Sequence, residues 1–234
     1  MKKSVLFSLI GAVALLLSSL TLTPSTASAQ GAGMISSVIN RMERNRRDLR
    51  SLRAAIQMEK FNAQLGDKDN YFGEVIYLPG SGRNNSVRVD WQRPQRETLA
   101  VKDGKYTLFR PRLNMAYEGS ANSKNGKASS VLGFGLNVSQ QQLRANFEPL
   151  QYLGEGNLYG NVHVTWLKLV PKGKAGYKFA EIWVDDSGMP VQTKVVEHNN
   201  DSTTVRLTNV QRNARVSPEE FSLQLPSDVK RVRG

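Results

Sequence analysis

Few side chains in this sequence have the types and the spacing that catalysis requires. His163 and His198 each fall inside a predicted strand, and a strand histidine without a carboxylate partner or a second ligand is usually a surface or packing residue. Asp185–Asp186 lies in a predicted hairpin turn and Glu219–Glu220 in a predicted helical first turn, so neither pair has the separation that a general acid and base need. We therefore predict no catalytic residue, and a protein that is not an enzyme.

Metal and cofactor sites are not indicated either. The chain has no cysteine, which excludes disulfides, thiol catalysis and thiolate ligands. No nucleophile elbow, phosphate-cradling loop or metal-ligand cluster occurs. The glycine pairs in "GSG" at 80–82 and "GFG" at 133–135 lack the strand-to-helix context of a nucleotide site. We predict no cofactor and no bound metal.

The N-terminus is typical of an exported protein. Lys2 and Lys3 precede an apolar run over 5–20, and "ASA" at 27–29 has the small-x-small form that signal peptidase accepts. The run contains serines and a glycine and is short for a membrane span, which needs about 20 apolar residues. We predict a signal peptide over 1–29, cleaved before Gln30, and a single periplasmic domain over 30–234.

The charge balance is strongly basic. The formal net charge of +12 falls to +10 when Lys2 and Lys3 leave with the signal peptide. Such a balance suits nucleic acid or an anionic membrane surface, and export argues against nucleic acid. An anionic membrane surface therefore stays open as a partner, beside the alternative of a basic surface that is merely solvated.

The elements that must position any site are mostly strands. Residues 34–48 place Ile35, Val38 and Met42 on one helical face and predict an amphipathic helix. From Leu52 the period changes to two, as in a strand with one buried face, and its phase slips near Phe61, where we expect a bulge.

Further strands follow with short connections. In "ETLAVKDGKYTLFRP", residues 97–111, the Asp103–Gly104 pair predicts a tight hairpin turn. Strong strand patterns recur in "SVRVDW", "NMAYEG", "NVHVTWLKLVP", "KFAEIWVD", "PVQTKVVEH" and "STTVRLTNV". We predict an antiparallel meander, mainly β with helices, that is curled or closed to limit its exposed edges.

One region breaks the strand pattern. A polar loop over 120–130 leads into the apolar "VLGFGLN", and Ser139 is a candidate cap for a short helix that carries Leu143 and Phe147. A long loop of this kind is seldom a simple connector. Either the segment fills one end of the sheet as ordinary core, or it is a movable cover over an apolar space.

These features, in this order, resemble the periplasmic outer-membrane lipoprotein carrier family (LolA type). The matching motifs are "GEVIY" from Gly73, "VRVDWQRP", the hairpin "LAVKDGKYTLFRP", the paired hairpins "AEIWVDDSGMPVQTKVVEHNNDSTTVRLTNV" and the ending "FSLQLPSDVKRV". The similarity covers most of residues 34–231. It implies an incomplete antiparallel barrel with an N-terminal helix and a helical lid over an apolar cavity.

The resemblance also implies a function. Such a carrier is a soluble periplasmic monomer that shields the acyl chains of lipoproteins, its cargo, and ferries them from the inner to the outer membrane. An inner-membrane ABC transporter loads it, and an outer-membrane lipoprotein acceptor unloads it. The acceptor has the same fold but requires an N-terminal lipidated cysteine, which this chain lacks. The alternatives are a periplasmic regulator or sensor on the same fold, or a carrier of another lipid, either phospholipid or glycolipid.

Site residues follow from the same resemblance. The implied cavity wall comprises Trp91, Leu108, Met115, Tyr117 and Trp166, and the implied lid comprises Leu132, Phe134, Leu136, Leu143 and Phe147. A register shift of one residue would exchange the inward and outward sets. Members of the family have an Arg-Pro pair whose arginine holds the lid, but Pro79 lacks a preceding arginine, so Arg83 and Arg88 are the candidates for that role.

Overall fold

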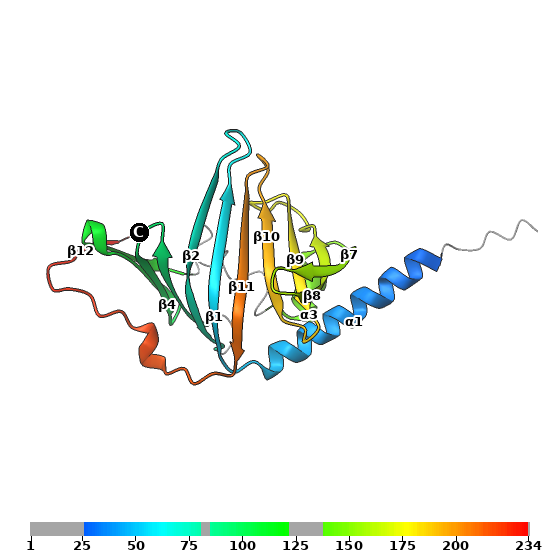
Figure 1. Cartoon of the computed structure of the whole chain (residues 1–234), viewed down its shortest axis with the longest axis horizontal. Helices are drawn as coiled ribbons and strands as arrows, with labels where there is room; N and C mark the ends of the chain where they lie inside the picture. The colour runs from blue at the N-terminus through cyan, green and yellow to red at the C-terminus, as the bar shows by residue number, and fades with distance from the viewer. Residues whose placement is uncertain (1–25, 81–84, 122–137, 234) are drawn as a thin grey trace, which may run out of the picture.

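The computed structural model describes residues 26–80, 85–121 and 138–233. Its strands form one 12-stranded sheet in the order β12-β6-β5-β4-β3-β2-β1-β11-β10-β9-β8-β7. Figure 1 shows the sheet twisting strongly from end to end, with helix α1 at the lower end of the strands on one side. Because β12 and β7 are terminal and do not pair, the sheet is an incomplete barrel, which agrees with the predicted fold class.

The chain builds this sheet from two meanders. The first consists of β1 (Leu52–Phe61), β2 (Lys68–Leu78), β3 (Ser86–Arg93), β4 (Glu97–Lys102), β5 (Lys105–Arg110) and β6 (Met115–Ser120). The second consists of β7 (Gln151–Leu158), β8 (Val162–Leu169), β9 (Phe179–Asp185), β10 (Pro190–Val196) and β11 (Ser202–Arg212). Antiparallel pairing of β1 with β11 joins them, and β12 (Lys230–Arg233) adds a parallel strand beside β6. The helical elements are α1 (Thr26–Asp48), η1 (Pro111–Leu113), α3 (Gln140–Asn146) and η2 (Pro218–Phe221).

The predicted N-terminal helix is the C-terminal part of α1, which begins at Thr26 rather than at residue 34. Val38 and Met42 are buried on its apolar face. Its last turn carries Arg46 and Arg47, whose positive charges interact favourably with the partial negative charge at the C-terminus of the helix. Among the described residues no helix combines the length and the apolar character needed to cross a membrane.

The hairpin predicted from "ETLAVKDGKYTLFRP" is confirmed as β4 and β5. Asp103 and Gly104 have φ angles of 51° and 71°, the left-handed conformation that a tight hairpin turn requires. The register places Lys102 opposite Lys105 and Leu99 opposite Leu108. This register fixes which side chains of the hairpin share a face.

Two details of the predicted strands are wrong. No bulge interrupts the pairing of β1 with β2 near Phe61, because the regular register continues to Phe61 opposite Lys68. The irregularity of β1 lies instead between Arg53 and Ala55, in its pairing with β11. His198 lies in the turn after β10, because β10 ends at Val196. His163 lies in β8 as predicted.

The pairing register identifies which residues share a face of the sheet. Met58 pairs with Val205, and Val205 pairs with Thr193. Thr193 pairs with Ile182, and Ile182 with Leu167, so these five residues lie on one face. We call this the inner face, because Ile182 and Leu167 are fully buried there in a cluster with residues of α1 and α3.

The hydrophobic core lies mainly on the inner face, in two clusters. The first surrounds β1 to β3 and β11 and contains Leu49, Leu52, Ala54, Ile56, Met58, Val75, Tyr77, Val89, Trp91, Val164, Met189, Val191, Val205 and Leu207. The second joins both helices to β8 and β9 and contains Val38, Ile39, Met42, Leu143, Phe147, Leu167, Leu169, Ala180, Ile182 and Val184.

The turn between β9 and β10 fixes α1 against the sheet. Gly188 has a φ of 83°, and a Cβ atom on it would lie 2.3 Å from the backbone of Arg41. Asn45 of α1 donates a hydrogen bond of 3.5 Å to the sulfur of Met189. A larger residue at position 188 would therefore push the helix away from the sheet.

Candidate binding site on the inner face

Four of the five predicted wall residues lie together on the inner face. Met58 pairs with Tyr71, whose ring meets Trp91 edge-on with 5.9 Å between the centroids. The buried Val89, two residues before Trp91, pairs with Leu99 in β4. This places the inner face of β1 on the same side of the sheet as the inner face of β3 and β4.

The same face continues to β6. Leu99 pairs with Leu108, and Leu108 pairs with Tyr117. Met115 is two residues before Tyr117 and therefore projects to the same side. The register thus brings Trp91, Leu108, Met115 and Tyr117 together on one surface.

This part of the inner face is less buried than the rest. Trp91 is 9% exposed, whereas the apolar side chains on the inner face of β4 to β6 are half-buried. Those side chains are Leu99, Val101, Tyr106, Leu108, Met115 and Tyr117. Among the described residues, the cluster that contains α1 and α3 has no member from β4, β5 or β6. The inner face of β4 to β6 is therefore an apolar surface continuous with the core and separate from the helices.

One ion pair interrupts this apolar surface. Arg110 pairs with Glu97 at 3.1 Å between Nε and Oε1, and its guanidinium lies 5.3 Å from the centroid of the Tyr117 ring. The Tyr117 hydroxyl donates to the sulfur of Met115 at 3.8 Å. Because Glu97 occupies one side of the guanidinium, Arg110 keeps further N–H donors for a polar group bound beside the apolar side chains.

Trp166, the fifth predicted wall residue, lies on the opposite face. It is adjacent to Leu167, which is fully buried on the inner face, and it stacks on Trp183 with 5.2 Å between the ring centroids. β8 carries apolar side chains on both faces, including Val164 and Leu167. The alternation of polar and apolar residues therefore does not identify the inner face of this strand, and the prediction was one residue out of phase.

Two of the five predicted lid residues belong to the packed core. Leu143 and Phe147 are 2% and 8% exposed, in the cluster with α1, β8 and β9. Ser139 caps α3 through a capping box with Gln142, as the sequence predicts. The other three predicted lid residues, Leu132, Phe134 and Leu136, lie outside the described residues.

Polar contacts hold α3 at both ends. Glu43 of α1 accepts a hydrogen bond from the backbone N–H of Gln140 at 3.3 Å. At the other end, Glu148 N donates to the carbonyl of Val170, and Lys172 N donates to the carbonyl of Asn146. α3 is therefore anchored both to α1 and to the loop between β8 and β9.

Glu43 is the most strongly perturbed carboxylate in the described part of the chain. Hydrogen bonds from Arg46, at 2.7 and 3.1 Å, lower the pKa of Glu43 from its usual 4.5 to about 2, with further contributions from Gln140 N and Arg47. The charged form of Glu43 thus joins α1 to the start of α3.

Neither candidate for the lid-holding arginine is placed at a lid. Arg83 lies outside the described residues. Arg88 projects to the outer face, where it pairs with Asp90 at 2.8 Å and donates to the carbonyl of Glu220 at 2.9 Å. Glu220 also pairs with Arg53, and Phe221 beside it is 2% exposed. Arg88 therefore fixes η2 to the outer face of the sheet.

His163 has acidic neighbours that its own strand does not reveal. Its Nδ1 lies 2.8 Å from Asp186 in the next hairpin, and its Nε2 lies 4.0 Å from Glu155. The hydrogen bond to Asp186 raises the pKa of His163. Three or more metal-ligating groups do not converge anywhere in the described ranges. All three side chains are exposed, and β8 does not neighbour β4, β5 or β6 in the sheet order.

Several inner-face residues were missed from the sequence. Leu99, Tyr106 and Arg110 lie on the same face as Leu108 because they pair with it or alternate with it along β5. Applying the period of two to both arms of the hairpin would have found Leu99 and Tyr106. The ion pair between Glu97 and Arg110 had no sequence signal beyond its position at the two ends of the hairpin.

Comparisons with known proteins agree with this architecture. The family model described as outer membrane lipoprotein carrier protein LolA matches residues 82–224, from just before β3 to just beyond η2. Comparison with curated proteins gives no match.

Solved structures share the fold at low sequence identity. An uncharacterized conserved protein from Thermus thermophilus is 12% identical, with 86% of this chain and 99% of that chain covered and a TM-score of 0.55. MucB is 16% identical, with 82% of this chain and 63% of MucB covered and a TM-score of 0.54. MucB is also found in a Pseudomonas aeruginosa MucA/MucB complex. At these identities the likeness concerns the fold alone.

Proposed function

This chain belongs to the LolA family of outer membrane lipoprotein carrier proteins, and on that premise we propose that it is a periplasmic carrier of acylated lipoproteins. In this proposal it shields the acyl chains of its cargo between the inner and the outer membrane. An inner-membrane ABC transporter loads it, and an outer-membrane lipoprotein acceptor unloads it. The observation that carries the proposal is the half-buried apolar surface on β4 to β6.

The acyl chains are proposed to lie along the inner face of β3 to β6. Trp91, Leu108, Met115 and Tyr117 form the wall in this proposal, and Leu99 extends it. An acyl chain has no polar atoms to satisfy, so a surface of apolar side chains continuous with the core is a suitable partner. Trp166 is left out of the wall because it lies on the opposite face.

Release requires that binding be limited. Each fully buried methylene contributes about 0.8 kcal/mol, so several fully enclosed acyl chains would be bound too tightly to transfer. Half-buried side chains can supply only part of that energy. The ion pair between Arg110 and Glu97 limits the apolar area further and offers N–H donors to the ester or amide carbonyl at the head of an acyl chain.

The cover over this surface is proposed to come from the segment that carries Leu132, Phe134 and Leu136. Leu143 and Phe147 follow it and would anchor its C-terminal end in the core. The structure does not assign the lid-holding role to Arg88, which binds η2 on the outer face.

A tryptophan-quenching experiment tests the location of the bound chains. The protein has three tryptophans, so Trp166→Phe with Trp183→Phe leaves Trp91 as the only reporter of the inner face. The matched variant, Trp91→Phe with Trp166→Phe, leaves Trp183 on the outer face. Brominated acyl chains are expected to quench Trp91 strongly and Trp183 weakly. Equal quenching of both, or none of Trp91, would contradict the proposed site.

Native mass spectrometry of the protein purified from the periplasm tests the cargo. A bound triacylated lipoprotein is the expected result. Phospholipid or glycolipid alone would favour the carrier of another lipid, and a protein partner without lipid would favour a regulator or sensor. N-terminal sequencing of the same sample tests cleavage before Gln30.

A further inference from the structure

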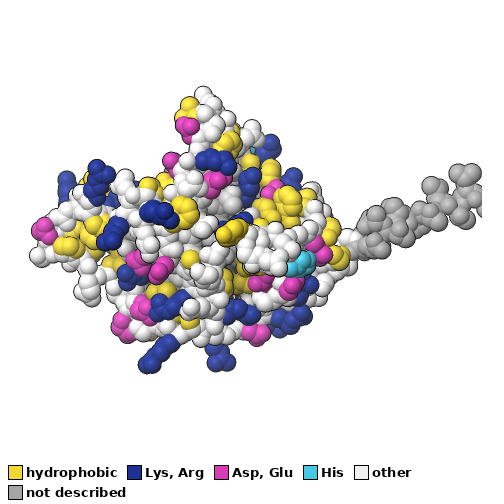
Figure 2. Space-filling view, viewed as in Figure 1, with side chains coloured by type: hydrophobic (Ala, Val, Ile, Leu, Met, Phe, Trp, Pro, Cys, Tyr) yellow, Lys and Arg dark blue, Asp and Glu magenta, His cyan; other side chains and the backbone are white. Residues whose placement is uncertain are grey.

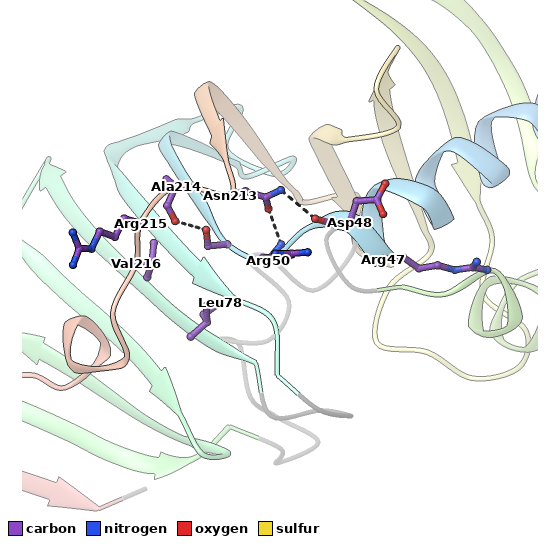
Figure 3. Close-up of a pocket in the computed structure, with 9 residues that line it drawn as sticks. Arg47, Asp48, Arg50, Leu78, Asn213, Ala214, Arg215 and Val216 are labelled. Atoms are coloured by element: carbon purple, nitrogen blue, oxygen red, sulfur yellow. Dashed lines mark hydrogen bonds between the residues drawn. The ribbon is translucent and has the colours of Figure 1, made fainter.

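Arginines gather at the end of the molecule where α1 meets β1 and where β11 ends. A pocket of about 660 Å³ lies there, lined by Arg47, Asp48, Arg50, Ser51, Leu78, Asn213, Ala214, Arg215 and Val216 (Figure 3). Figure 2 shows Lys and Arg side chains projecting along the corresponding lower edge. We call the five exposed arginines of this end the arginine surface: Arg44, Arg47, Arg50, Arg212 and Arg215.

The charge at this end is positive and largely unneutralised. Residues 41–51 and 211–216 together contain seven arginines and two acidic residues, Glu43 and Asp48. Within the described ranges, the side chains of Arg44, Arg50, Arg212 and Arg215 make no ion pair. Arg47 reaches Glu43 at 3.2 Å, but Glu43 is already held by Arg46 at 2.7 Å.

Hydrogen bonds hold the two segments that carry these arginines. Asn213 accepts from the backbone N–H of Arg50 at 2.7 Å and donates to the carbonyl of Asp48 at 3.2 Å. Its own backbone N–H donates to the carbonyl of Ser51, and the Ser51 hydroxyl donates to the carbonyl of Ala214. The arginines therefore project from a braced backbone rather than from a free tail.

The arrangement does not suit a single small anion. In Figure 3 Arg47 and Arg215 point away from each other, from opposite sides of the pocket. One phosphate could not contact both guanidinium groups. A surface that carries many phosphates could satisfy each arginine separately, because a guanidinium binds a phosphate through paired N–H donors.

The composition also argues against a protein partner. Arginine occurs at protein interfaces too, but there it usually accompanies apolar and aromatic residues at the centre. The large apolar side chains that are exposed in the described ranges lie elsewhere, at Leu65, Leu113, Leu153, Tyr159 and Val162. Every basic residue in 41–51 and 211–216 is an arginine. The surface therefore offers phosphate-binding groups without an apolar centre.

We propose that the arginine surface docks this protein on a bilayer with anionic phosphate headgroups. Juxtaposed cations and anionic lipids attract each other within a Debye length, so this contact is reversible and weakens as the salt concentration rises. The proposal concerns docking on the membrane and does not depend on which molecule occupies the inner face of β4 to β6.

Co-sedimentation with lipid vesicles tests the proposal. The purified protein is mixed with vesicles of phosphatidylcholine alone or with added phosphatidylglycerol, at low and high salt. A triple variant, Arg47→Ala, Arg50→Ala and Arg215→Ala, is expected to bind the anionic vesicles about 100-fold more weakly at low salt. The control Arg112→Ala, Lys174→Ala and Lys230→Ala removes the same charge from exposed positions elsewhere and is expected to change binding less than threefold.

The remaining outcomes overturn the proposal. Equal binding to both kinds of vesicle, or binding to an acidic protein but not to anionic vesicles, would exclude a membrane-docking surface. An equal loss in both triple variants would mean that only net charge matters. Leu108→Asn separates docking from cargo uptake: if it weakens vesicle binding as much as the arginine triple variant does, lipid extraction explains the signal. Far-UV circular dichroism checks that each variant is folded.

Discussion

The two sides of the inner face use the same sheet in different ways. On β8 and β9, Leu167, Ala180 and Ile182 are fully buried against residues of α1 and α3. On β4 to β6, Leu108 and Tyr117 are only half-buried, although an unbroken series of strand pairs connects them to the same face. Strand pairing is antiparallel on both sides, but among the described residues α1 and α3 share a buried cluster with β8 and β9 and not with β4 to β6, and this cover accounts for the difference.

This difference separates stability from binding. Side chains sealed between the sheet and the helices have no access to a ligand, so they contribute to folding. Side chains on β4 to β6 lose less exposure on folding and keep apolar area available for a bound chain. The expected consequences of substitution therefore differ between the two sides, and the following predictions compare them directly.

The largest expected effect is on stability at the sealed side. Ile182→Ala removes a fully buried side chain and is expected to lower the free energy of unfolding by about 2–5 kcal/mol. Leu108→Ala is expected to cost less than half as much, because its side chain is half-buried. Urea denaturation of both variants measures the difference. Equal costs would show that β4 to β6 are sealed as well.

The second effect concerns Glu43, which joins the two helices of the sealed side. Glu43→Gln removes the charged acceptor of Arg46 and Gln140 N and is expected to lower the free energy of unfolding by about 1.5–3 kcal/mol. Because the pKa of Glu43 is lowered to about 2 in the folded state, its contribution is complete above pH 4.5 and disappears as the pH falls through 2.

Unfolding measured between pH 2 and pH 6 tests the role of Glu43. The wild type should lose stability relative to Glu43→Gln as the pH falls through this range. Glu59→Gln is the control, because Glu59 pairs with Lys68 on an exposed part of β1 and β2. A pH dependence that is the same in Glu43→Gln and in the wild type would contradict this role.

The third effect is on ligand binding at the less buried side. Leu108→Asn places an amide in the proposed wall and is expected to weaken the binding of an apolar fluorescent probe about tenfold. Thr107→Asn is the matched control, because position 107 projects to the opposite face of the same strand. Fluorescence titrations measure the affinity of the probe for both variants. Equal affinities would show that the inner face of β5 does not contact the probe.

The smallest effect concerns His163, which is exposed and belongs neither to the side covered by the helices nor to the apolar surface on β4 to β6. Its pKa is raised by Asp186, so Asp186→Asn should lower it, and NMR titration of the imidazole protons measures the change. Because the pKa of His163 is raised in the folded state, its protonated form contributes to the stability of the fold. That contribution is complete below the ordinary pKa of 6.5 and disappears as the pH rises through the pKa of the folded state. Since His163 is exposed, we expect probe binding to stay unchanged in Asp186→Asn.

Much of the fold was predictable because local rules agreed with the tertiary structure. The Asp103–Gly104 turn, the Ser139 cap and most strands follow from residue type and period. The two terminal strands, β7 and β12, were not predicted. β7 contains Gly154 and Gly156, which are unfavourable in strands, and β12 has only four residues and depends on its pairing with β6.

The candidate site was predictable only where one face of a strand is apolar. Met115 and Tyr117 satisfy that condition, and their shared face follows from alternation, but Leu108 does not, because Phe109 lies on the opposite face of β5. Trp166 does not, because β8 is apolar on both faces. The environment of Arg88 depends on Glu220, which is 132 residues away in the sequence, so no local pattern reveals it.

An open sheet with an apolar face has to avoid pairing with other copies of itself through its edge strands, which are β12 and β7 among the described residues. At one edge, β12 is short and carries Lys230 and Arg233, whose charges would repel an identical strand, while Arg231 pairs with Glu118 at 3.0 Å. At the other edge, β7 has an irregular register next to Gly154, whose φ is 135°. Edge protection of this kind allows the sheet to stay open without the aggregation that unpaired strands invite.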